Sequence, residues 1–530
     1  MTTRSTSSST RQSQLQSNQT NRSKCQTPPH PPPQKRRTVT LLHPDLGIGG
    51  AERLVLDVAL SLQARGHRVK IYTSHRDPNH CFEEARDGTL DVAVRGNTMF
   101  PDQIAGRFRV LFAVLRQMHL VAGLLAASKG EEGGKGGGDG ETEEGEEEVY
   151  IVDQVPACVP ILKTFGPFLS SLSSSSRNNA KSKTRRKQRI LFYCHFPDQL
   201  LAKRNEGGAI RQLVKACYRY PFDWFEGWAI GAADKVVANS KFTCGVVRQV
   251  FGDGLGDVRV VYPCVDTGAK NVGKLVEGGK LWGGKKILLS INRFERKKDV
   301  GLAIRAYHGL GEEGRQGTRL IIAGGYDNRV HENVQYHTDL DDLATGLGLR
   351  TATSKTVISA LSIPDSIEVL FLLSVPSAFK QTLLSAATLL VYTPSYEHFG
   401  IVPVEAMHAG LPVLAVNNGG PLETIVEGKT GWLRAANAIE EWTAVMHKAL
   451  WEMNAQEAAV MRANAKERVE KEFSLQAMGD RLEAEIQDMF DNEPRPFHGL
   501  WHALLFGAAM LGLTIAVLIA AFIRLRMKRG

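Results

Sequence analysis

The chain has 530 residues, of which 43% are hydrophobic and 23% are charged, so it can form about two or three domains with buried cores. Its formal net charge of +9 would suit a nucleic-acid partner, but much of the basic excess lies in the two tails and in one insert. A surface that binds duplex nucleic acid is therefore not expected. The seven cysteines are widely spaced and form no CxxC or His/Cys ligand cluster, which indicates reduced thiols facing the cytosol.

The N-terminal residues 1–37 form a Ser, Thr, Gln and Pro tract that ends in KRR. This tract lacks the apolar region of a secretory signal, and its composition predicts disorder. From Thr38 onward, short β-rich apolar runs alternate with amphipathic stretches, which is typical of parallel sheets in α/β domains. The first unit is expected to be a strand at TVTLLHP, a helix over Ala51–Arg65 that ends at Gly66, and a strand at HRVKIYTS.

The rest of the first domain, which we expect to span residues 38–275, contains the strand candidates RILFYC, KVVAN and VRVVYP. Two low-complexity stretches interrupt it, an acidic Gly-rich one at 129–148 and a basic Ser-rich one at 170–189. Both are interpreted as solvated surface inserts, because charge runs of this kind are usually disordered loops. The Gly- and Lys-rich stretch 268–284 is interpreted as a linker.

A second alternating series covers residues 276–455, and a helical segment over 456–496 follows it. Its expected strands are KKILLSI, RLIIAGG, IEVLFLL, LLVYTPS and PVLAVNN, with helices at Val300–His308 and near Ile401–Ala409. Two consecutive halves of this kind predict an α/β protein with two facing Rossmann-like, doubly wound sheets. Ligands would bind at the carboxyl ends of the strands.

The segment 501–523 near the C-terminus contains no Asp, Glu, Lys or Arg and is long enough for one bilayer crossing. A buried core helix is the alternative, which this length and the basic flank RLRMKRG disfavour. The positive-inside rule would keep that flank cytosolic and would place the globular part in a lumen. A short translocated tail, or a segment that enters the bilayer and returns, removes this conflict, and the sequence leaves the choice open.

The loop Gly47–Gly50 joins the first strand to its helix, where glycines let a backbone approach a phosphate or a sugar at the positive end of a helix. It lacks the full G-x-G-x-x-G pattern, and no acidic residue ends the following strand, so a dinucleotide site is not expected. Gly49 and Gly50 are candidate donor-binding residues. A tight turn needed only for packing explains the glycines equally well.

A cationic turn follows the strand KKILLSI in the sequence SINRFERKKD. It contains Arg293, Arg296, Lys297 and Lys298, and Asp299 is expected to cap the next helix. Cationic groups here would neutralise a nucleoside diphosphate, which gains charge as its glycosidic bond breaks. The alternative is a solvated charged turn, which is the more common role of an isolated cluster of this kind.

The most specific pattern is the E-x7-E of EHFGIVPVE, which places Glu397 before a helix start and Glu405 within the helix. Backbone N–H groups around Gly400–Val402 can hold a phosphate, Glu405 can accept ribose hydroxyls and Glu397 can reach the sugar. Eight residues of helix span about 12 Å, too far for a glycosidase carboxylate pair, so the two acids are interpreted as separate ligand contacts. Helix capping by solvent-facing acids is the alternative. No Asp-x-Asp pattern ends a strand, which predicts a reaction without a metal ion.

These motifs resemble those of retaining glycosyltransferases of the GT-B fold, in glycosyltransferase group 1. Longer runs narrow the resemblance to the endoplasmic reticulum α-1,3/1,6-mannosyltransferase family of dolichol-linked oligosaccharide synthesis. They are HPDLGIGGAERLVLDVAL, FYCHFPDQLLAKR, ADKVVANSKFT, VVYPCVD, SINRFERKKDVGLAI, IIAGGYDNRVHENVQYH and YTPSYEHFGIVPVEAMHAG. The resemblance covers most of the chain from Thr38 to Gly431.

The resemblance implies a GDP-mannose donor and an acceptor of mannosyl-di-N-acetylglucosamine on dolichyl diphosphate. The acceptor would receive an α-1,3 and then an α-1,6 mannose on the cytosolic face of the endoplasmic reticulum membrane. Retention would need no dedicated nucleophile, because the leaving phosphate helps to take the acceptor proton. The resemblance implies no cofactor, and other lipid-linked oligosaccharide mannosyltransferases are candidate partners.

Carried over residue by residue, the resemblance assigns Arg293 and Lys298 to the GDP diphosphate and Glu405 to the ribose. His195 follows RILFYC, where such enzymes bring a histidine to the sugar, and its imidazole can donate to a hydroxyl near neutral pH. A structural, hydrogen-bonded histidine is the alternative. Glu397 would contact mannose, together with backbone groups of Phe399, Gly400, Ile401 and Val402. The expected catalytic residues are Glu397, His195, Lys298 and Arg293.

Two other functions are compatible with parts of this pattern. A sugar-nucleotide epimerase on the same fold would turn over its donor without an acceptor, but the membrane segment and the lack of a separate acid/base carboxylate cluster argue against it. A non-catalytic membrane scaffold would bind partners through its charged inserts. The presence of Arg293, Lys298, Glu397 and Glu405 argues against a decayed site.

Overall fold

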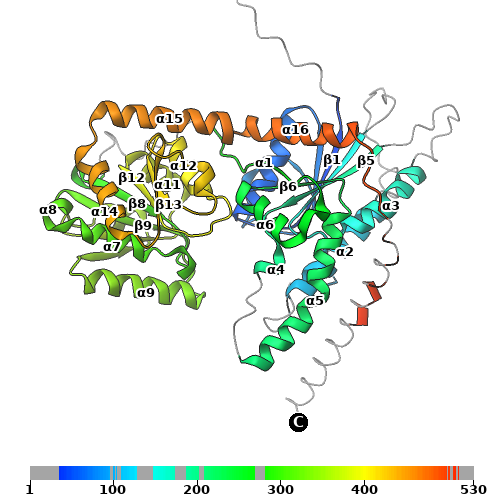
Figure 1. Cartoon of the computed structure of the whole chain (residues 1–530), viewed down its shortest axis with the longest axis horizontal. Coiled ribbons are helices and arrows are strands. Elements are labelled where there is room, and N and C mark those ends of the chain that lie inside the picture. The colour runs from blue at the N-terminus through cyan, green and yellow to red at the C-terminus, as the bar shows by residue number, and fades with distance from the viewer. Residues whose placement is uncertain are drawn as a thin grey trace, which may run out of the picture. The chain divides into compact units, whose positions relative to one another are not determined.

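The computed structural model describes residues 35–95, 99–127 except 102 and 104–108, 147–173, 187–201, 208–268, 281–497 and a few positions within 499–512. Two seven-stranded sheets, each with every strand pair parallel, account for most of this part of the chain (Figure 1). The prediction of two doubly wound α/β halves is therefore confirmed.

The first sheet has the strand order β3-β2-β1-β4-β5-β6-β7, which reverses direction between β1 and β4. Its strands are β1 (Thr38–Leu46), β2 (Arg68–Arg76), β3 (Asp91–Val94), β4 (Glu147–Asp153), β5 (Lys187–Cys194), β6 (Lys235–Ala238) and β7 (Arg259–Val260). Successive side chains of a strand point to opposite faces, so Leu41 enters one core cluster and Leu42 the other. Both faces are buried, as a parallel sheet requires.

Six α-helices accompany the first sheet in the described part of the chain. They are α1 (Gly50–Ala64), α2 (Arg109–Ala127), α3 (Val159–Ser173), α4 (Asp198–Leu201), α5 (Ala209–Gly231) and α6 (Lys241–Phe251). Helix α1 buries Leu54, Val58 and Leu62, which recur at helical spacing, against the sheet. Helix α6 begins where the Ser240 hydroxyl accepts a hydrogen bond from the Thr243 N–H at 2.9 Å.

The second sheet has the strand order β10-β11-β9-β8-β12-β13-β14, which reverses between β8 and β12. Its strands are β8 (Lys286–Ile291), β9 (Thr318–Gly324), β10 (Thr351–Ser354), β11 (Val369–Leu373), β12 (Leu389–Tyr392), β13 (Val413–Val416) and β14 (Gly431–Arg434). Its helices are α7 (Gly301–Gly309), α8 (Gly311–Arg315), α9 (His331–Gly346), α10 (Val357–Leu361), α11 (Ser377–Ala386), α12 (Ile401–His408), α13 (Pro421–Thr424) and α14 (Ile439–His447). Leu288 and Leu289 again face opposite clusters, so two buried cores enclose this sheet as well.

Two long helices, α15 (Ala455–Phe473) and α16 (Leu475–Asp491), follow one another with only Ser474 between them. Helix α15 packs against α12 of the second domain, whereas α16 packs against α1 of the first (Figure 1). Met478, Leu482 and Ile486 of α16 are fully buried in a core cluster of the first sheet. The C-terminal part of the chain therefore completes a core that begins at the other end of the sequence.

A buried ion cluster accompanies the packing of α16 on the first sheet. The Arg37 guanidinium donates to Glu147 at 2.8 Å and also pairs with Glu483 of α16. The second carboxylate oxygen of Glu483 contacts the His67 imidazole at 2.7 Å. Each charged group thus has a partner, which is the condition under which buried charges are tolerated.

Several sequence-based boundaries need correction. The predicted acidic insert 129–148 ends too late, because Glu147 and Glu148 already belong to β4. The predicted basic insert 170–189 is too long at both ends, since α3 continues to Ser173 and β5 begins at Lys187. The remainder of both inserts lies outside the described residues, as do residues 269–280 of the predicted linker.

The predicted membrane segment 501–523 also falls almost entirely outside the described residues. Among the helices that the structure does describe, none is both long enough and apolar enough to cross a bilayer.

We expect Leu482→Ala to lower the free energy of unfolding of the first domain by about 2–5 kcal/mol, because it leaves a cavity beneath α16. Chemical denaturation followed by tryptophan fluorescence measures this loss. Val460→Ala is the matched control, since Val460 of α15 is 55% exposed and its truncation should change the stability by less than about 0.5 kcal/mol. Equal effects of the two substitutions would contradict the role of α16 in this core.

Candidate active site

The candidate residues of each sheet follow strands at or next to the reversal of strand order. In the second sheet, the cationic turn follows β8 and the E-x7-E motif follows β12. In the first sheet, Gly47–Gly50 follows β1, and His195 follows β5, which pairs with β4. A reversal opens a crevice because neighbouring connections depart to opposite faces, and this is where ligands of open α/β sheets bind.

Lys298 and Glu397 are brought together by this topology. The Lys298 ammonium lies 2.5 Å from a Glu397 carboxylate oxygen, and only 12% of the Lys298 side chain is exposed. The Thr393 hydroxyl, just beyond β12, donates to the Lys298 carbonyl at 2.7 Å and so fixes the backbone of the turn as well. Two motifs 99 residues apart in the sequence therefore form one ion-paired unit.

The other cations of the turn point to different partners. Arg293 and Lys297 each contact Glu295 at 3.1 Å and remain 65% and 68% exposed. Arg296 instead pairs with Asp339 of α9. The turn is thus divided, and Lys298 is the cation that it directs to the E-x7-E motif.

The prediction that Asp299 caps the following helix is wrong. Its backbone has φ = 41°, in the left-handed region, and its carboxylate contacts Arg305 at 3.4 Å. Helix α7 begins after Val300 without a side-chain cap. The left-handed backbone lets the chain leave the cationic turn and enter α7 directly.

The E-x7-E motif places the start of α12 at the crevice. Gly400, which precedes the helix, has φ = 82°, a backbone conformation that glycine adopts without strain. Pro403 lies in the first turn, as predicted, and is buried. The first N–H groups of any α-helix lack partners within that helix, so the N-terminus of α12 offers donors and a positive dipole end.

Glu405 has a partner that the sequence did not suggest. The Lys380 ammonium of α11 donates to both of its carboxylate oxygens, at 2.7 and 2.8 Å. A carboxylate keeps further lone pairs after accepting these bonds, so Glu405 can still accept from a ligand. Glu397 and Glu405 are therefore each neutralised by a different lysine.

A second glycine loop, which sequence reasoning missed, holds the E-x7-E segment in place. The Gly420 N–H donates to the Glu397 carbonyl at 2.7 Å, and the Asn418 side chain accepts from the Tyr396 N–H at 2.7 Å. A Cβ atom at Gly420 would lie only 2.1 Å from the Phe399 carbonyl oxygen. The signal was present as NNGG directly after the strand PVLAV.

His195 belongs to a buried group that includes two further residues missed from the sequence. Asp153, the last residue of β4, contacts the His43 Nδ1 at 2.6 Å through one oxygen and the His195 Nε2 through the other. Burial by itself raises the pKa of Asp153, but the two imidazoles outweigh it and hold this pKa at about 2. Asp153 is therefore ionised at every physiological pH.

Contacts between residues of the two domains join the loop of His195 to the E-x7-E motif. The Phe196 ring stacks on the His398 ring with centroids 3.8 Å apart and an interplanar angle of 3°. Burial lowers the pKa of His398 to about 4, so this stacked imidazole is neutral at physiological pH. The carboxylate of Glu423 in α13 also accepts from the N–H groups of Lys241 and Phe242, at the start of α6.

Gly49 and Gly50 are not joined to these groups by any hydrogen bond in the described part of the chain. They form the start of α1, at the same edge of the first sheet as His43. A Cβ atom at Gly50 would meet nothing within 4 Å, which leaves room over this turn. The same described residues contain no cluster of three or more His, Cys, Asp or Glu side chains that could hold a metal ion.

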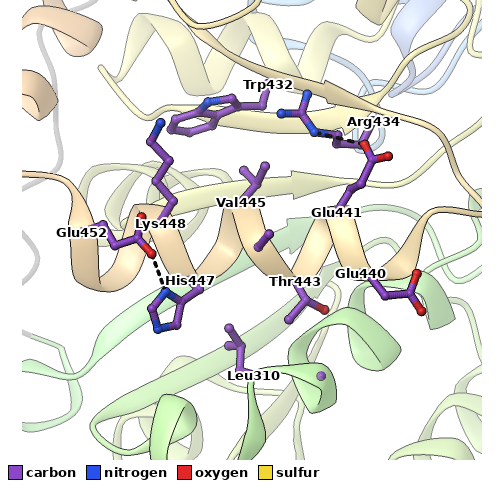
Figure 2. A pocket seen from close by; sticks show the side chains of 12 residues that line it. Leu310, Trp432, Arg434, Glu440, Glu441, Thr443, Val445, His447, Lys448 and Glu452 are labelled. Carbon is purple, nitrogen blue, oxygen red and sulfur yellow. Dashed lines mark hydrogen bonds and ion pairs between the residues drawn. The ribbon is translucent and has the colours of Figure 1, made fainter.

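A depression of about 720 Å³ lies elsewhere on the second domain, near the edge strand β14 (Figure 2). Its charged side chains pair with one another, as Arg434 does with Glu441 and His447 with Glu452 (Figure 2). None of the candidate residues lines it. We therefore place the site at the reversal between β8 and β12, where the ion-paired motifs meet.

Two family models match parts of the chain that carry the cationic turn, the E-x7-E motif and His195. Residues 277–468 match the group 1 glycosyl transferases, and residues 168–269 match glycosyltransferase family 4. The chain is 48% identical over 463 residues to the α-1,3/1,6-mannosyltransferase of Neurospora crassa, covering 86% of this chain and 91% of the relative. The chain belongs to the α-1,3/1,6-mannosyltransferase family.

Other members of the family cover a similar share of the chain at lower identity. The α-1,3/1,6-mannosyltransferase of Rhizomucor pusillus is 41% identical over 475 residues, covering 87% of this chain and 93% of the relative. That of Saccharomyces cerevisiae is 40% identical over 477 residues, covering 87% and 86%. The resemblance found in the sequence motifs is thus confirmed, and this mannosyltransferase is a group 1 glycosyltransferase.

Solved structures establish the fold class. A sucrose-phosphate synthase from Thermosynechococcus elongatus matches with a TM-score of 0.58 at 17% identity, covering 86% of this mannosyltransferase and all of that chain. A glycosyltransferase from Rickettsia africae matches with a TM-score of 0.54 at 15% identity, covering 87% and 100%. Together with the two seven-stranded parallel sheets, these matches show the GT-B fold.

We expect Gly420→Ala to displace the loop that carries Phe399 and Gly400, because the new methyl group would overlap the Phe399 carbonyl. The substitution should reduce mannosyl transfer by at least about tenfold and destabilise the second domain by about 1–3 kcal/mol. Transfer rates and melting temperatures measure the two effects. Gly346→Ala in α9 is the matched control, because a Cβ there meets nothing within 4 Å and should leave both quantities nearly unchanged. Full activity of Gly420→Ala would show that this loop does not hold the site.

Proposed function

We propose that this mannosyltransferase transfers mannose from GDP-mannose to mannosyl-di-N-acetylglucosamine on dolichyl diphosphate, first in α-1,3 and then in α-1,6 linkage, with retention. The observation that carries the proposal is the 48% identity to an α-1,3/1,6-mannosyltransferase over 86% of the chain. The ion-paired unit of Lys298 and Glu397 supports it chemically.

In this proposal, the diphosphate of GDP rests between the cationic turn and the N-terminus of α12. Lys298 supplies a compact charge, Arg293 supplies a planar guanidinium that is exposed enough to turn toward a ligand, and the Gly400–Val402 backbone supplies N–H donors. Charge grows on the leaving diphosphate as the glycosidic bond breaks. Donors that are already in place stabilise this charge without reorganisation.

Glu397 has a role that follows from its ion pair. Without a donor, it neutralises Lys298 and keeps this largely buried side chain in position. When the diphosphate takes over part of that neutralisation, the Glu397 carboxylate becomes available to accept hydrogen bonds from mannose hydroxyls. Phe399 and Ile401 contribute backbone groups on either side of Gly400.

Glu405 is the proposed ligand of the ribose hydroxyls. A bare carboxylate near a diphosphate would repel it, but Lys380 offsets this charge at 2.7 Å. The oxygens of Glu405 retain lone pairs for the ribose, so binding and charge balance are compatible. On the opposite sheet, His195 and the turn of Gly49 and Gly50 are proposed to contact the mannose end of the donor.

The acceptor is carried by a lipid, and we propose that the apolar segment 501–523 attaches the enzyme to the endoplasmic reticulum membrane with its catalytic domains facing the cytosol. This placement would bring the crevice to the acceptor on the same membrane. Other lipid-linked oligosaccharide mannosyltransferases would then be neighbours on that surface. The reaction is proposed to need no cofactor or metal ion.

The direct test uses radiolabelled GDP-mannose and a synthetic lipid-linked trisaccharide acceptor with the full-length enzyme in lipid vesicles. We expect two products in sequence, each with a retained α-anomeric configuration. Digestion with linkage-specific mannosidases identifies the α-1,3 and α-1,6 bonds. Donor turnover without an acceptor would instead indicate a sugar-nucleotide epimerase, and the absence of any product from folded enzyme would contradict the proposal.

We expect Lys298→Ala to reduce transfer by about 100- to 1000-fold, because it removes a fixed positive charge from the leaving diphosphate. Its neighbour Lys297 is the matched control, since its ammonium is 68% exposed and contacts Glu295 instead of the E-x7-E motif. Lys297→Ala should retain activity within about threefold. If both variants lose activity equally, the distinction between the two lysines is wrong.

A further inference from the structure

The carboxylate of Asp153 lies between two histidines at the strand-order reversal of the first sheet. His43 comes from β1, Asp153 ends β4, and His195 follows β5, so the group crosses three adjacent strands. The Asp153 side chain is 4% exposed and that of His43 is 1% exposed, whereas 21% of the His195 side chain reaches the surface. The group is therefore buried at one end and open at the other.

The hydrogen bonds of this group define which ring nitrogens carry hydrogen. Asp153 is ionised and can only accept, so His43 donates from Nδ1 and His195 donates from Nε2. The Nδ1 atom of His195 takes part in no hydrogen bond among the described residues. When Nε2 carries the hydrogen of a neutral ring, the lone pair of Nδ1 can accept a hydrogen bond. Nδ1 is therefore an available acceptor at the end of the group that reaches the surface.

The position of His195 relative to Glu397 indicates which ligand groups its Nδ1 atom could contact. The next residue, Phe196, stacks on His398, and His398 adjoins Glu397 of the proposed donor site. A ligand bound at Glu397 would therefore lie close to the backbone that carries His195. Its hydroxyl groups could then donate to the Nδ1 atom of a neutral His195 imidazole.

We infer that Asp153 is a positioning residue, which holds His195 in the tautomer and orientation that let its Nδ1 accept a hydrogen bond from a sugar hydroxyl. His43 braces Asp153 from the buried side, because it occupies the second carboxylate oxygen and prevents the carboxylate from rotating. This inference rests on the proposed transfer reaction and extends it, since it assigns a task to Asp153 and His43, to which the sequence motifs assigned none.

An isosteric change tests the inference. Asp153→Asn keeps the shape, but its amide offers one acceptor and one donor group in place of two acceptors, so one of the two histidines must change its tautomer. We expect kcat to fall by about 100-fold or more, with the KM for GDP-mannose changed by less than about threefold. A fall in melting temperature with unchanged kcat would overturn the inference.

A double-mutant cycle separates positioning from general stability. His195→Gln removes the ring nitrogen that meets the sugar while keeping a donor toward Asp153. If Asp153 acts through His195, Asp153→Asn should cause little further loss of kcat in the His195→Gln enzyme. Full additivity of the two losses would contradict the inference. Absence of transfer by the unaltered enzyme would instead refute the proposed function, so the two failures are distinguishable.

His43 provides a second, independent measurement if Asp153→Asn does not fold. His43→Asn places an amide N–H near the position of Nδ1 and should retain kcat within about tenfold, because the brace on Asp153 persists. His43→Leu removes the brace and should approach the loss of the His195→Gln enzyme. Equal kcat values for the Asn and Leu variants, with GDP-mannose still raising the melting temperature of both, would overturn the role of the brace.

Discussion

The ion pair between Lys298 and Glu397 is the contact on which the candidate site depends. It joins the turn after β8 to the segment after β12, which are the two strands between which the order of the second sheet reverses. The pair distinguishes this turn from a solvated charged loop, and it gives Glu397 a role beyond preceding a helix start. With it, a cation, a helix N-terminus and a carboxylate lie together at the strand-order reversal, and the first two are groups that bind phosphates.

The surrounding structure keeps that contact rigid through close backbone approaches. The loop of Gly419 and Gly420 lies against Glu397 and Phe399, where any side chain would collide with a carbonyl group. Gly324 is constrained in the same way by the Asn292 carbonyl, at the start of the cationic turn. Glycines at these positions are therefore explained by packing against the site as well as by turn geometry. We therefore expect the protein to contribute to the proposed reaction mainly by positioning the donor and the acceptor. A single reactive side chain would contribute less.

Carboxylates shared between cationic or imidazole partners recur across the molecule. Asp153 accepts from His43 and His195 in the first sheet, and Glu483 accepts from Arg37 and His67 where α16 returns to that sheet. The first group lies at the crevice edge of the sheet, whereas the second holds the C-terminal helix. A carboxylate with two partners therefore belongs to the proposed site at Asp153, and another stabilises the packing of α16 on the first sheet at Glu483.

The sequence predicted the alternation of strands and helices because buried parallel strands leave long apolar runs, as in RILFYC and RLIIAGG. It missed the edge strands β3 and β10, whose DVAV and TATS segments are short and only partly buried. It also missed the buried strand β4, whose first residues Glu147 and Glu148 were assigned to the acidic insert. Lys298 and Glu397 could be named because each lies within a recognisable motif. Lys380 and Asp153 could not be named, because neither lies in a recognisable motif and their partners are distant in the sequence. Gly420 was missed although NNGG follows the strand PVLAV, because a glycine pair does not show which backbone it approaches. Asp299 was misjudged because a capping residue and a left-handed turn residue look alike in sequence.

The most direct test of the central claim is a crystal structure of the enzyme with GDP and an unreactive mannose analogue. The account predicts that the diphosphate lies within hydrogen-bonding distance of the Lys298 ammonium and the backbone N–H groups at Gly400–Val402, with the ribose at Glu405. A diphosphate bound in the depression beside β14, or anywhere that leaves the Lys298–Glu397 pair without ligand contact, would contradict it.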